Sequence, residues 1–433
     1  MIDATHAPGL QSWAAAANTP GNDFPIQNLP HGVFRRHGTT EPFRGGIAIG
    51  DSILDLTAAC EAGAFSGEVR DLARMAGEAE LNRYMAAGAK AWSRLRGALS
   101  GALRAGAPEE QHLRNCLVAQ CDADYAVPAS IGDFTDFFTS YSHMMNMGRI
   151  FHATAAELPS FKWLPIAYHG RSSSIEVSGT RFHRPQGQFR SPADAQPSFG
   201  PSKRLDYEME LGFFIGPGNA RGQPITIGGA ESHVFGVCLL NDWSARDVQG
   251  WESMPLGPFL AKNFMTSISP WIVTMAALAP FRTALPRGPD DPPEMPNLRS
   301  PDGGAHGGLD IVLEVSVKTA RSGDAELRLS RTNARHTYWS LAQMVTHHTE
   351  GGCNLRPGDL LGTGTQSGPN PGEQGCLLEL SAGGKEPVTL SNGETRTLLE
   401  DGDTVILRGW CERDSWRRIG FGECSGTVLP AKS

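Results

Sequence analysis

The sequence predicts a mainly β protein with two or three domains. The chain has 433 residues, which exceeds the usual size of a single domain. It contains 51 Gly and 30 Pro residues, a composition that favours turns and short strands over long helices. Beyond residue 120, short apolar runs alternate with turn-rich stretches, a pattern typical of a β roll or sandwich.

The first part of the chain has a different pattern from the rest. Residues 45–56 alternate apolar positions around a Gly-Asp turn, which predicts a β-hairpin. Apolar side chains in residues 81–103 recur at spacings of three, four and seven, which predicts a long helix that ends before Pro108. We therefore expect one domain in residues 1–120 and a second in residues 121–433.

Several apolar, β-like runs predict the strands of the second domain. They are separated by Gly, Pro and Asn clusters, which mark turns. The longest turn-rich stretch, residues 285–308, is expected to form an exposed loop. The predicted strands lie in residues 209–216, 234–242, 310–317, 376–380 and 403–409.

Charge and composition exclude several kinds of partner. The net charge of −8 argues against a nucleic-acid surface, because phosphate binding requires clustered Lys and Arg. The eight cysteines form no CxxC pair and are expected to be buried, reduced thiols. We find neither a signal-like start nor a run of 18 apolar residues. The sequence therefore predicts a cytoplasmic protein without a nucleic-acid or membrane partner.

A pair of acidic residues in the second domain is the first candidate for a site. Glu208 and Glu210 would share one face of a strand, with Met209 and Leu211 on the opposite, apolar face. Two carboxylates this close repel each other unless a cation lies between them or one is protonated. An isolated pair of this kind is usually a solvated strand face, but the apolar residues that follow weaken that interpretation.

A second group of polar residues follows the predicted strand 234–242. Asp242 ends that strand, where an Asp often caps a turn. Arg246 and Gln249 would share a face with Asp242 if a helical turn begins there. Lys262 lies among apolar neighbours, so its charge requires an anionic partner.

A third group contains Asp136 and His143, which are seven residues apart and would share a helix face. A histidine among aromatic residues is more often a core residue than a base, and the aligned Asp shifts this expectation only modestly. Asp136 together with Glu208, Glu210 and Asp242 would form an all-oxygen ligand set. Ca²⁺ and Mg²⁺ prefer such ligands, whereas Zn²⁺ prefers Cys or His.

These motifs occur in the order and spacing of the fumarylacetoacetase family, which the sequence resembles over nearly its whole length. The resemblance implies a small SH3-like N-terminal barrel, followed by the β-rich sandwich or roll of the family's catalytic domain. It also implies a homodimer that hydrolyses fumarylacetoacetate in tyrosine and phenylalanine catabolism. The shared motifs lie in residues 131–137, 168–174, 177–180, 200–219, 235–249, 255–264, 364–369 and 418–430.

The resemblance further implies a role for each side chain that matches a family motif. A Ca²⁺ or Mg²⁺ ion would be held by Asp136, Glu208, Glu210 and Asp242, with Lys262 and Thr266 beside it. His143 would be the general base that activates water, oriented by Glu379. Arg246, Gln249 and Lys262 would stabilise the oxyanion, and Tyr168 and Thr365 would bind substrate.

Two substrate-contact positions depart from the family pattern. His152 stands where the family usually has Arg, and Ser253 where it usually has Tyr. An Arg binds a carboxylate at any pH, whereas a His carries the required charge only when protonated. Arg149, three residues earlier, would substitute for the missing Arg if the local backbone shifted.

These departures keep other functions open. One alternative is a hydrolase of fumarylpyruvate or another acylpyruvate. Another is an oxo-acid lyase, a decarboxylase or hydratase that uses the same metal site, although it would not need the His143–Glu379 pair to activate water. The last is a non-enzymatic module with structural Ca²⁺, in which Lys262, Arg246 and His143 would have no role.

Overall fold

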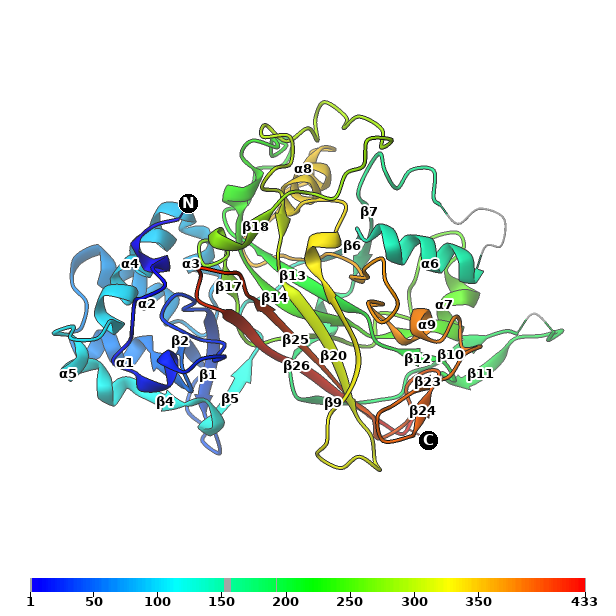
Figure 1. Cartoon of the computed structure of the whole chain (residues 1–433), viewed down its shortest axis with the longest axis horizontal. Coiled ribbons are helices and arrows are strands. Elements are labelled where there is room, and N and C mark those ends of the chain that lie inside the picture. The colour runs from blue at the N-terminus through cyan, green and yellow to red at the C-terminus, as the bar shows by residue number, and fades with distance from the viewer. Residues whose placement is uncertain (1, 152–156, 192, 433) are drawn as a thin grey trace.

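The computed structural model describes residues 2–151, 157–191 and 193–432 (Figure 1). Its N-terminal part, coloured blue to cyan, contains a five-stranded antiparallel sheet in the order β4-β3-β2-β1-β5, with helices packed beside it. The strands are β1 (His31–Arg36), β2 (Arg44–Ile49), β3 (Ser52–Asp55), β4 (Leu117–Ala119) and β5 (Ala123–Ala126). The helices are α1 (Leu56–Glu61), α2 (Gly67–Ala76), α3 (Asn82–Ala86), α4 (Gly88–Leu103) and α5 (Glu110–Leu113).

The hairpin predicted in residues 45–56 is confirmed, since Ile49 pairs with Ser52 across the turn between β2 and β3. The prediction of a single helix in residues 81–103 is wrong in one respect. It is divided into α3 and α4 at Gly88, whose φ of +81° is compatible with glycine but not with a continuous helix.

The rest of the chain is built around two sheets. The larger has eight strands, in the order β7-β6-β22-β13-β14-β16-β8 with β17 beside β14. Its strands are β6 (Phe134–Phe138), β7 (Ile166–Gly170), β8 (Ile175–Val177), β13 (Met209–Ile215), β14 (Val234–Asp242), β16 (Thr266–Ile268), β17 (Val273–Thr274) and β22 (Leu360–Gly362). The second sheet, in the order β21-β20-β25-β26-β9, contains β9 (Thr180–His183), β20 (Val312–Lys318), β21 (Leu327–Asn333), β25 (Thr404–Cys411) and β26 (Ile419–Leu429).

Short hairpins and helices complete this part. The two-stranded pairs are β10 (Gln186–Phe189) with β11 (Ser198–Pro201), β12 (Leu205–Asp206) with β15 (Ser244–Ala245), β18 (Arg282–Thr283) with β19 (Gly308–Leu309), and β23 (Val388–Thr389) with β24 (Thr395–Arg396). The helices are α6 (Tyr141–Phe151), α7 (Arg246–Glu252), α8 (Leu341–Thr349) and α9 (Leu377–Leu380).

The central strands are buried on both faces, which explains their nearly continuous apolar sequence. Alternate residues of β13 point to opposite sides. Leu211 and Phe213 pack in one core with Leu407 of the second sheet. Phe214 packs in another core with Trp92 of α4, so the eight-stranded sheet lies between the second sheet and the N-terminal helices. This double packing gives the site below a rigid base.

Four of the five predicted strands are confirmed, as β13, β14, β20 and β25. The fifth, in residues 376–380, is wrong, because Leu377–Leu380 form helix α9. The carboxylate of Asp206 accepts hydrogen bonds from the backbone N–H groups of Leu377 (2.9 Å) and Leu378 (3.1 Å) and so satisfies the start of this helix. Residues 285–308 form turns without a helix or strand before Gly308, as expected of a loop.

Candidate active site

Four carboxylates meet at one end of the eight-stranded sheet. Asp136 lies on β6, Glu210 on β13 and Asp242 at the end of β14, while Glu208 directly precedes β13. One oxygen from each carboxylate lies within 4.8 Å of the others, and all four residues are buried. The predicted alternation is confirmed, because Met209 and Leu211, on the face opposite Glu208 and Glu210, both pack in the apolar core.

Strand β22 passes between two of these acids and must be free of side chains there. Gly362 pairs with Asp136 on one side and with Gly212 on the other. A Cβ atom at Gly362 would lie 2.3 Å from Asp136 Oδ1 and 3.0 Å from Glu210 Oε2. The N–H of Gly364 then donates to the same two oxygens, at 3.1 and 3.0 Å. The glycines of this run therefore position the acids.

We expect the substitution Gly362→Ala to weaken divalent-cation binding by about tenfold or more, because its methyl group must displace Asp136 or Glu210. Calorimetric titration of the chelator-treated protein with Ca²⁺ and Mg²⁺ measures this. Gly97→Ala, on an exposed face of α4 with nothing within 4 Å of the added methyl, is the matched control and should bind normally. Equal affinity in both variants would show that β22 does not shape the ion site.

Two cations lie against the carboxylates. Lys262 Nζ donates to Glu208 Oε2 and, at 2.7 Å, to Asp242 Oδ2, which confirms that this lysine has anionic partners. Arg246 Nη1 donates to Glu208 Oε1 at 2.7 Å and to Gln249 Oε1 at 3.1 Å. Arg246 begins α7 and Gln249 lies on the same helix, whereas Asp242 ends β14. The prediction that Asp242 shares a helix face with Arg246 and Gln249 is therefore wrong. The strand-to-helix corner brings these groups together instead.

Two hydroxyl groups complete the surroundings of Asp242. Tyr168 Oη donates to Asp242 Oδ2 at 2.7 Å, and Thr266 Oγ1 donates to Oδ1 at 3.1 Å. Both positions follow from strand register, because Tyr168 pairs with Asp136 across β6 and β7 and Thr266 pairs with Asp242 across β14 and β16.

The pKa values of the acids show an excess of negative charge. Burial opposes ionisation of Glu208, but Lys262 and Arg246 outweigh it and lower the pKa of Glu208 to about 2. Burial and the charge of Asp242 raise the pKa of Asp136 to about 8. Burial and the neighbouring acids also hold the pKa of Glu210 well above its usual range. Two nearby cations are therefore too few for four carboxylates.

These residues fit a divalent cation. Glu210 Oε1 is buried and has no hydrogen-bond partner among the described residues, so it is available as a ligand. The donor set of four carboxylates suits Ca²⁺ or Mg²⁺. Lys262 would lie beside such an ion rather than in its ligand shell, because an ammonium group has no lone pair.

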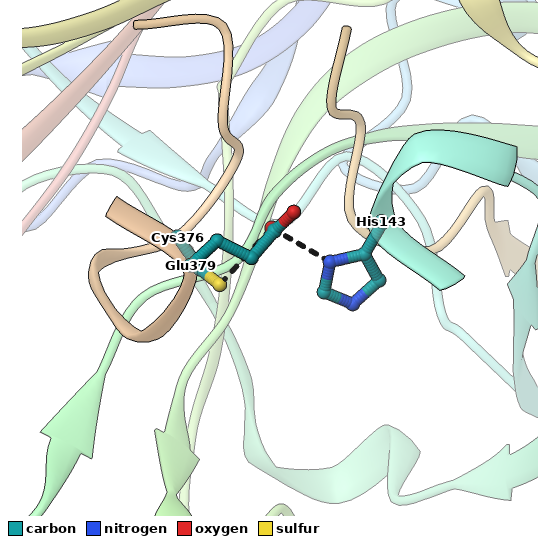
Figure 2. Close-up of side chains that lie close together, drawn as sticks. All are labelled: His143, Cys376 and Glu379. Atoms are coloured by element: carbon teal, nitrogen blue, oxygen red, sulfur yellow. Dashed lines mark hydrogen bonds and ion pairs between the residues drawn. The ribbon is translucent and has the colours of Figure 1, made fainter. Parts of the chain in front are cut away.

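A His–Glu pair forms a second group of buried polar side chains (Figure 2). His143 Nδ1 is 2.7 Å from Glu379 Oε2, and both side chains are buried. Glu379 accepts further hydrogen bonds from Asn146 Nδ2 (2.8 Å) and Ser367 Oγ (2.9 Å). Burial opposes ionisation of Glu379, but His143 and these donors lower its pKa. The carboxylate thus remains charged and fixes the orientation of the imidazole.

The prediction that Asp136 and His143 share a helix face is wrong. Asp136 lies on β6, and a new element, α6, begins at Tyr141 after a break at which Ser140 Oγ accepts a hydrogen bond from the N–H of His143 (3.2 Å). The two groups nevertheless belong to one site, because the charge of His143 contributes to the lowered pKa of Glu208.

Three contributors were not recognised from the sequence. Asp206 Oδ2 accepts a hydrogen bond from Arg246 Nε at 2.9 Å while the same carboxylate holds the first turn of α9, which carries Glu379. It therefore links the two halves of the site. Asn146, three residues after His143 on α6, is recognisable from helical spacing. Ser367 has no comparable sequence signal.

Two of the remaining predicted residues, Thr365 and Ser253, lie in the described part of the chain. Thr365 is buried, and its Oγ1 has no hydrogen-bond partner among the residues that the structure describes. Ser253 follows α7, and its Oγ donates to the carbonyl oxygen of Gln249 at 2.6 Å. His152 lies outside the described residues.

A hard-ligand cation site next to a His–Glu pair and several cationic donors is the arrangement of a hydrolase that activates water beside a divalent metal. Comparison with known proteins narrows this class. The profile described as "Fumarylacetoacetate (FAA) hydrolase C-terminal" matches residues 135–429, and "Fumarylacetoacetase N-terminal" matches residues 27–128. The chain belongs to the fumarylacetoacetate hydrolase family.

Curated relatives match along the whole chain. Fumarylacetoacetase of Oryza sativa is 45% identical, and the match covers 100% of both chains. Fumarylacetoacetase of Homo sapiens is 45% identical over 95% of this chain and 97% of its own. The solved structure of a fumarylacetoacetate hydrolase from Exiguobacterium antarcticum has a TM-score of 0.50 and 16% identity, and the match covers 93% of this chain and 99% of that chain. This last likeness supports the fold alone.

Proposed function

We propose that the chain hydrolyses fumarylacetoacetate to fumarate and acetoacetate, the last step of tyrosine and phenylalanine breakdown. The observation that carries this proposal is the His143–Glu379 pair beside the four buried carboxylates. Full-length relatives named fumarylacetoacetase, at 45% identity, support fumarylacetoacetate as the substrate.

The reaction requires water to attack a ketone and a carbanion to leave. The carbanion leaves readily only because a β-carbonyl delocalises it as an enolate. A divalent cation held by Asp136, Glu208, Glu210 and Asp242 would supply the charge that stabilises this enolate. The proposed base is His143 Nε2, since Nδ1 is bonded to Glu379. It takes a proton from water as the oxygen bonds to the ketone carbon, and later returns it to the leaving carbon after the C–C bond breaks.

The cationic groups would stabilise the tetrahedral alkoxide. Lys262 has three N–H donors, and its bonds to Glu208 and Asp242 leave one for the substrate. Gln249 accepts a hydrogen bond from Arg246 through Oε1, which leaves its Nε2 amide free to donate. Tyr168 and Thr365 would contact the substrate from the neighbouring strand and loop. Well-placed donors of this kind typically contribute a few kcal/mol each.

The same proposal includes a homodimer in the cytoplasm. The segment after α7 exposes Met254 (87%), Leu256 (95%) and Phe259 (68%), an apolar surface of the kind that a partner covers. Light scattering of the wild type and of a Leu256→Lys, Phe259→Lys variant tests the dimer. A variant with the same dimeric mass as the wild type would reject this surface as the dimer interface. Among the described residues, no helix is long and apolar enough to cross a membrane.

We also propose that the N-terminal sheet is an SH3-like barrel and that the domains divide into residues 1–120 and 121–433. Five short antiparallel strands support the barrel. With this division, β5 comes from the start of the second domain and pairs with β1 of the first, at Val33–Ala126 through Arg36–Ala123. Separate expression of the N-terminal domain with and without β5 tests the boundary.

Fumarylpyruvate is the second candidate substrate, favoured by Ser253 and His152 at positions where the family usually has Tyr and Arg. We expect the purified protein to release fumarate and acetoacetate from fumarylacetoacetate, as observed by NMR. This release should stop when a chelator removes the divalent cation. Release of pyruvate from fumarylpyruvate alone would keep the mechanism and replace the substrate. Inactivity towards both with Ca²⁺ or Mg²⁺ present would favour an oxo-acid lyase.

A gain-of-function experiment tests the two departures directly. If they weaken substrate binding, the double substitution His152→Arg, Ser253→Tyr should lower KM for fumarylacetoacetate by about tenfold, because a bidentate Arg–carboxylate contact is regained. Ser253→Ala is the control, since it removes only the hydroxyl that bonds to Gln249. A higher KM in the double variant would show a pocket that is arranged for another acid.

A further inference from the structure

A large cavity lies away from the active site. Its volume is about 690 Å³, well within the range of small-molecule sites. One wall is the face of α4 that carries Trp92 and Arg96, and the lining continues to the start of β14. None of the four clustered carboxylates, nor His143, lines it. This cavity therefore has no role in the proposed hydrolysis.

Arg96 gives the cavity a buried positive charge. It is 6% exposed and donates to the carbonyl oxygens of Gln27 (2.5 Å) and Asn28 (2.7 Å) and to Thr5 Oγ1 (3.0 Å). Its guanidinium group forms no ion pair with a carboxylate among the described residues. Neutral oxygens thus use three of its five N–H donors. The carboxylate that acts on its charge, Asp3, is linked to it through Thr5, whose hydroxyl donates to Asp3 Oδ1 at 2.7 Å, so no carboxylate of the described residues bonds to the guanidinium directly.

The other cationic side chains at the cavity are already paired. Arg282 bonds to Glu231 at 2.6 Å, and Arg413 bonds to Asp310 at 3.1 Å. The excess charge of the cavity is therefore that of Arg96.

A second buried polar group without a partner lines the same cavity. His31 is 3% exposed, and its Nδ1 has no hydrogen-bond partner within the described part of the chain. Burial, with a contribution from the charge of Arg96, lowers the pKa of His31 to about 3, so its ring is neutral at physiological pH. A neutral imidazole can carry its proton on Nδ1 and donate it. This Nδ1 atom is buried below the cavity surface, so Arg96, with two further N–H groups, supplies the donors that an anion in the cavity can reach.

Aromatic rings form the apolar part of the wall. Trp92 lies one helical turn before Arg96, and its ring packs edge-on against Phe235 with centroids 5.2 Å apart. The ring of His31 lies 5.5 Å from the same Phe235. Phe235 is fully buried behind these rings, so Trp92 supplies the aromatic surface at the cavity and Arg96 supplies the charge.

We propose that this cavity binds a small aromatic carboxylate, with the carboxylate at Arg96 and the ring against Trp92. Strand β14 runs from the cavity at Val234 to the active site at Asp242. At 3.3 Å per residue this separation is about 26 Å, so the ligand does not compete with substrate. Binding and catalysis can therefore be measured independently.

Calorimetric titration of the full-length protein with phenylacetate tests the proposal, with phenylacetamide as the neutral probe. We expect saturable binding of phenylacetate and about tenfold or weaker binding of the amide, because the amide lacks the charge that Arg96 recognises. Equal binding of both probes, or of neither, would overturn the proposal. Competitive inhibition of fumarylacetoacetate hydrolysis by phenylacetate would place the probe in the active site and would also overturn it.

Three variants on α4 locate the bound probe. Ser93→Phe places a ring in the cavity from an exposed position that makes no side-chain hydrogen bond, so the fold is retained. It should abolish phenylacetate binding and leave hydrolysis unchanged. Lys90→Phe, exposed on the same helix but outside the cavity lining, is the matched control and should bind as the wild type does. Arg96→Met should weaken phenylacetate binding. The melting temperature of this variant, measured on the same sample, shows whether it is still folded.

Discussion

The substitution His143→Ala is expected to lower kcat for fumarylacetoacetate by about 10²–10⁴-fold, the usual contribution of a general base. His143 is held at 2.7 Å by Glu379, which has three further donors around it, including Cys376 Sγ at 3.3 Å (Figure 2). A ring oriented so firmly can present only Nε2 to water. Divalent-cation affinity should stay within about twofold of the wild type, because no imidazole nitrogen belongs to the carboxylate set.

Steady-state kinetics and calorimetric metal titration measure these two properties on the same protein sample. The control is His112→Ala, an exposed histidine of α5 whose ring makes no hydrogen bond in the described structure, and it should retain the wild-type kcat. Glu379→Gln should lower kcat less than His143→Ala, since it keeps the base but loses the charge that favours the imidazolium ion. A wild-type rate in His143→Ala would reject this residue as the base.

Local patterns predicted the acids better than the elements around them. Alternation along a strand was enough to place Glu208 and Glu210 together, because that rule depends only on the extended backbone. The helix α9 was not predictable in this way. Its apolar sequence fits a strand equally well, and its first N–H groups are satisfied by Asp206, about 170 residues earlier in the chain.

The spatial relation of His143 to the acids also needed the structure. A spacing of seven residues suggests one helix face, but β6 ends at Phe138 and α6 begins at Tyr141, so the chain turns between Asp136 and His143. The role of Gly362 depends likewise on β22 lying between β6 and β13, strands that are far apart in sequence. Such contacts follow from topology, which no short sequence window contains.

Replacing Glu210 by glutamine is expected to abolish both cation binding and turnover without destabilising the metal-free protein. Burial, together with repulsion by Asp136, Asp242 and Glu208, raises the pKa of Glu210, so its negative charge is unfavourable in the metal-free site. A neutral side chain of the same shape removes the repulsion and keeps an oxygen that can accept the hydrogen bond from Gly364. In the presence of chelator, the melting temperature of Glu210→Gln should therefore equal or exceed that of the wild type.

Glu208→Gln should behave oppositely, and the contrast tests the electrostatics of the site. The lowered pKa of Glu208 shows that its charge is stabilised by Lys262 and Arg246, which both bond to it. Loss of that charge leaves two buried cations short of a partner, a change that typically costs about 3–5 kcal/mol. Glu208→Gln should thus melt below the wild type in chelator, whereas Glu210→Gln should not. In both variants, Ca²⁺ or Mg²⁺ should no longer raise the melting temperature, because each lacks a ligand. If Glu210→Gln is instead the less stable of the two, the negative charges of the cluster are balanced in some way other than by a bound cation.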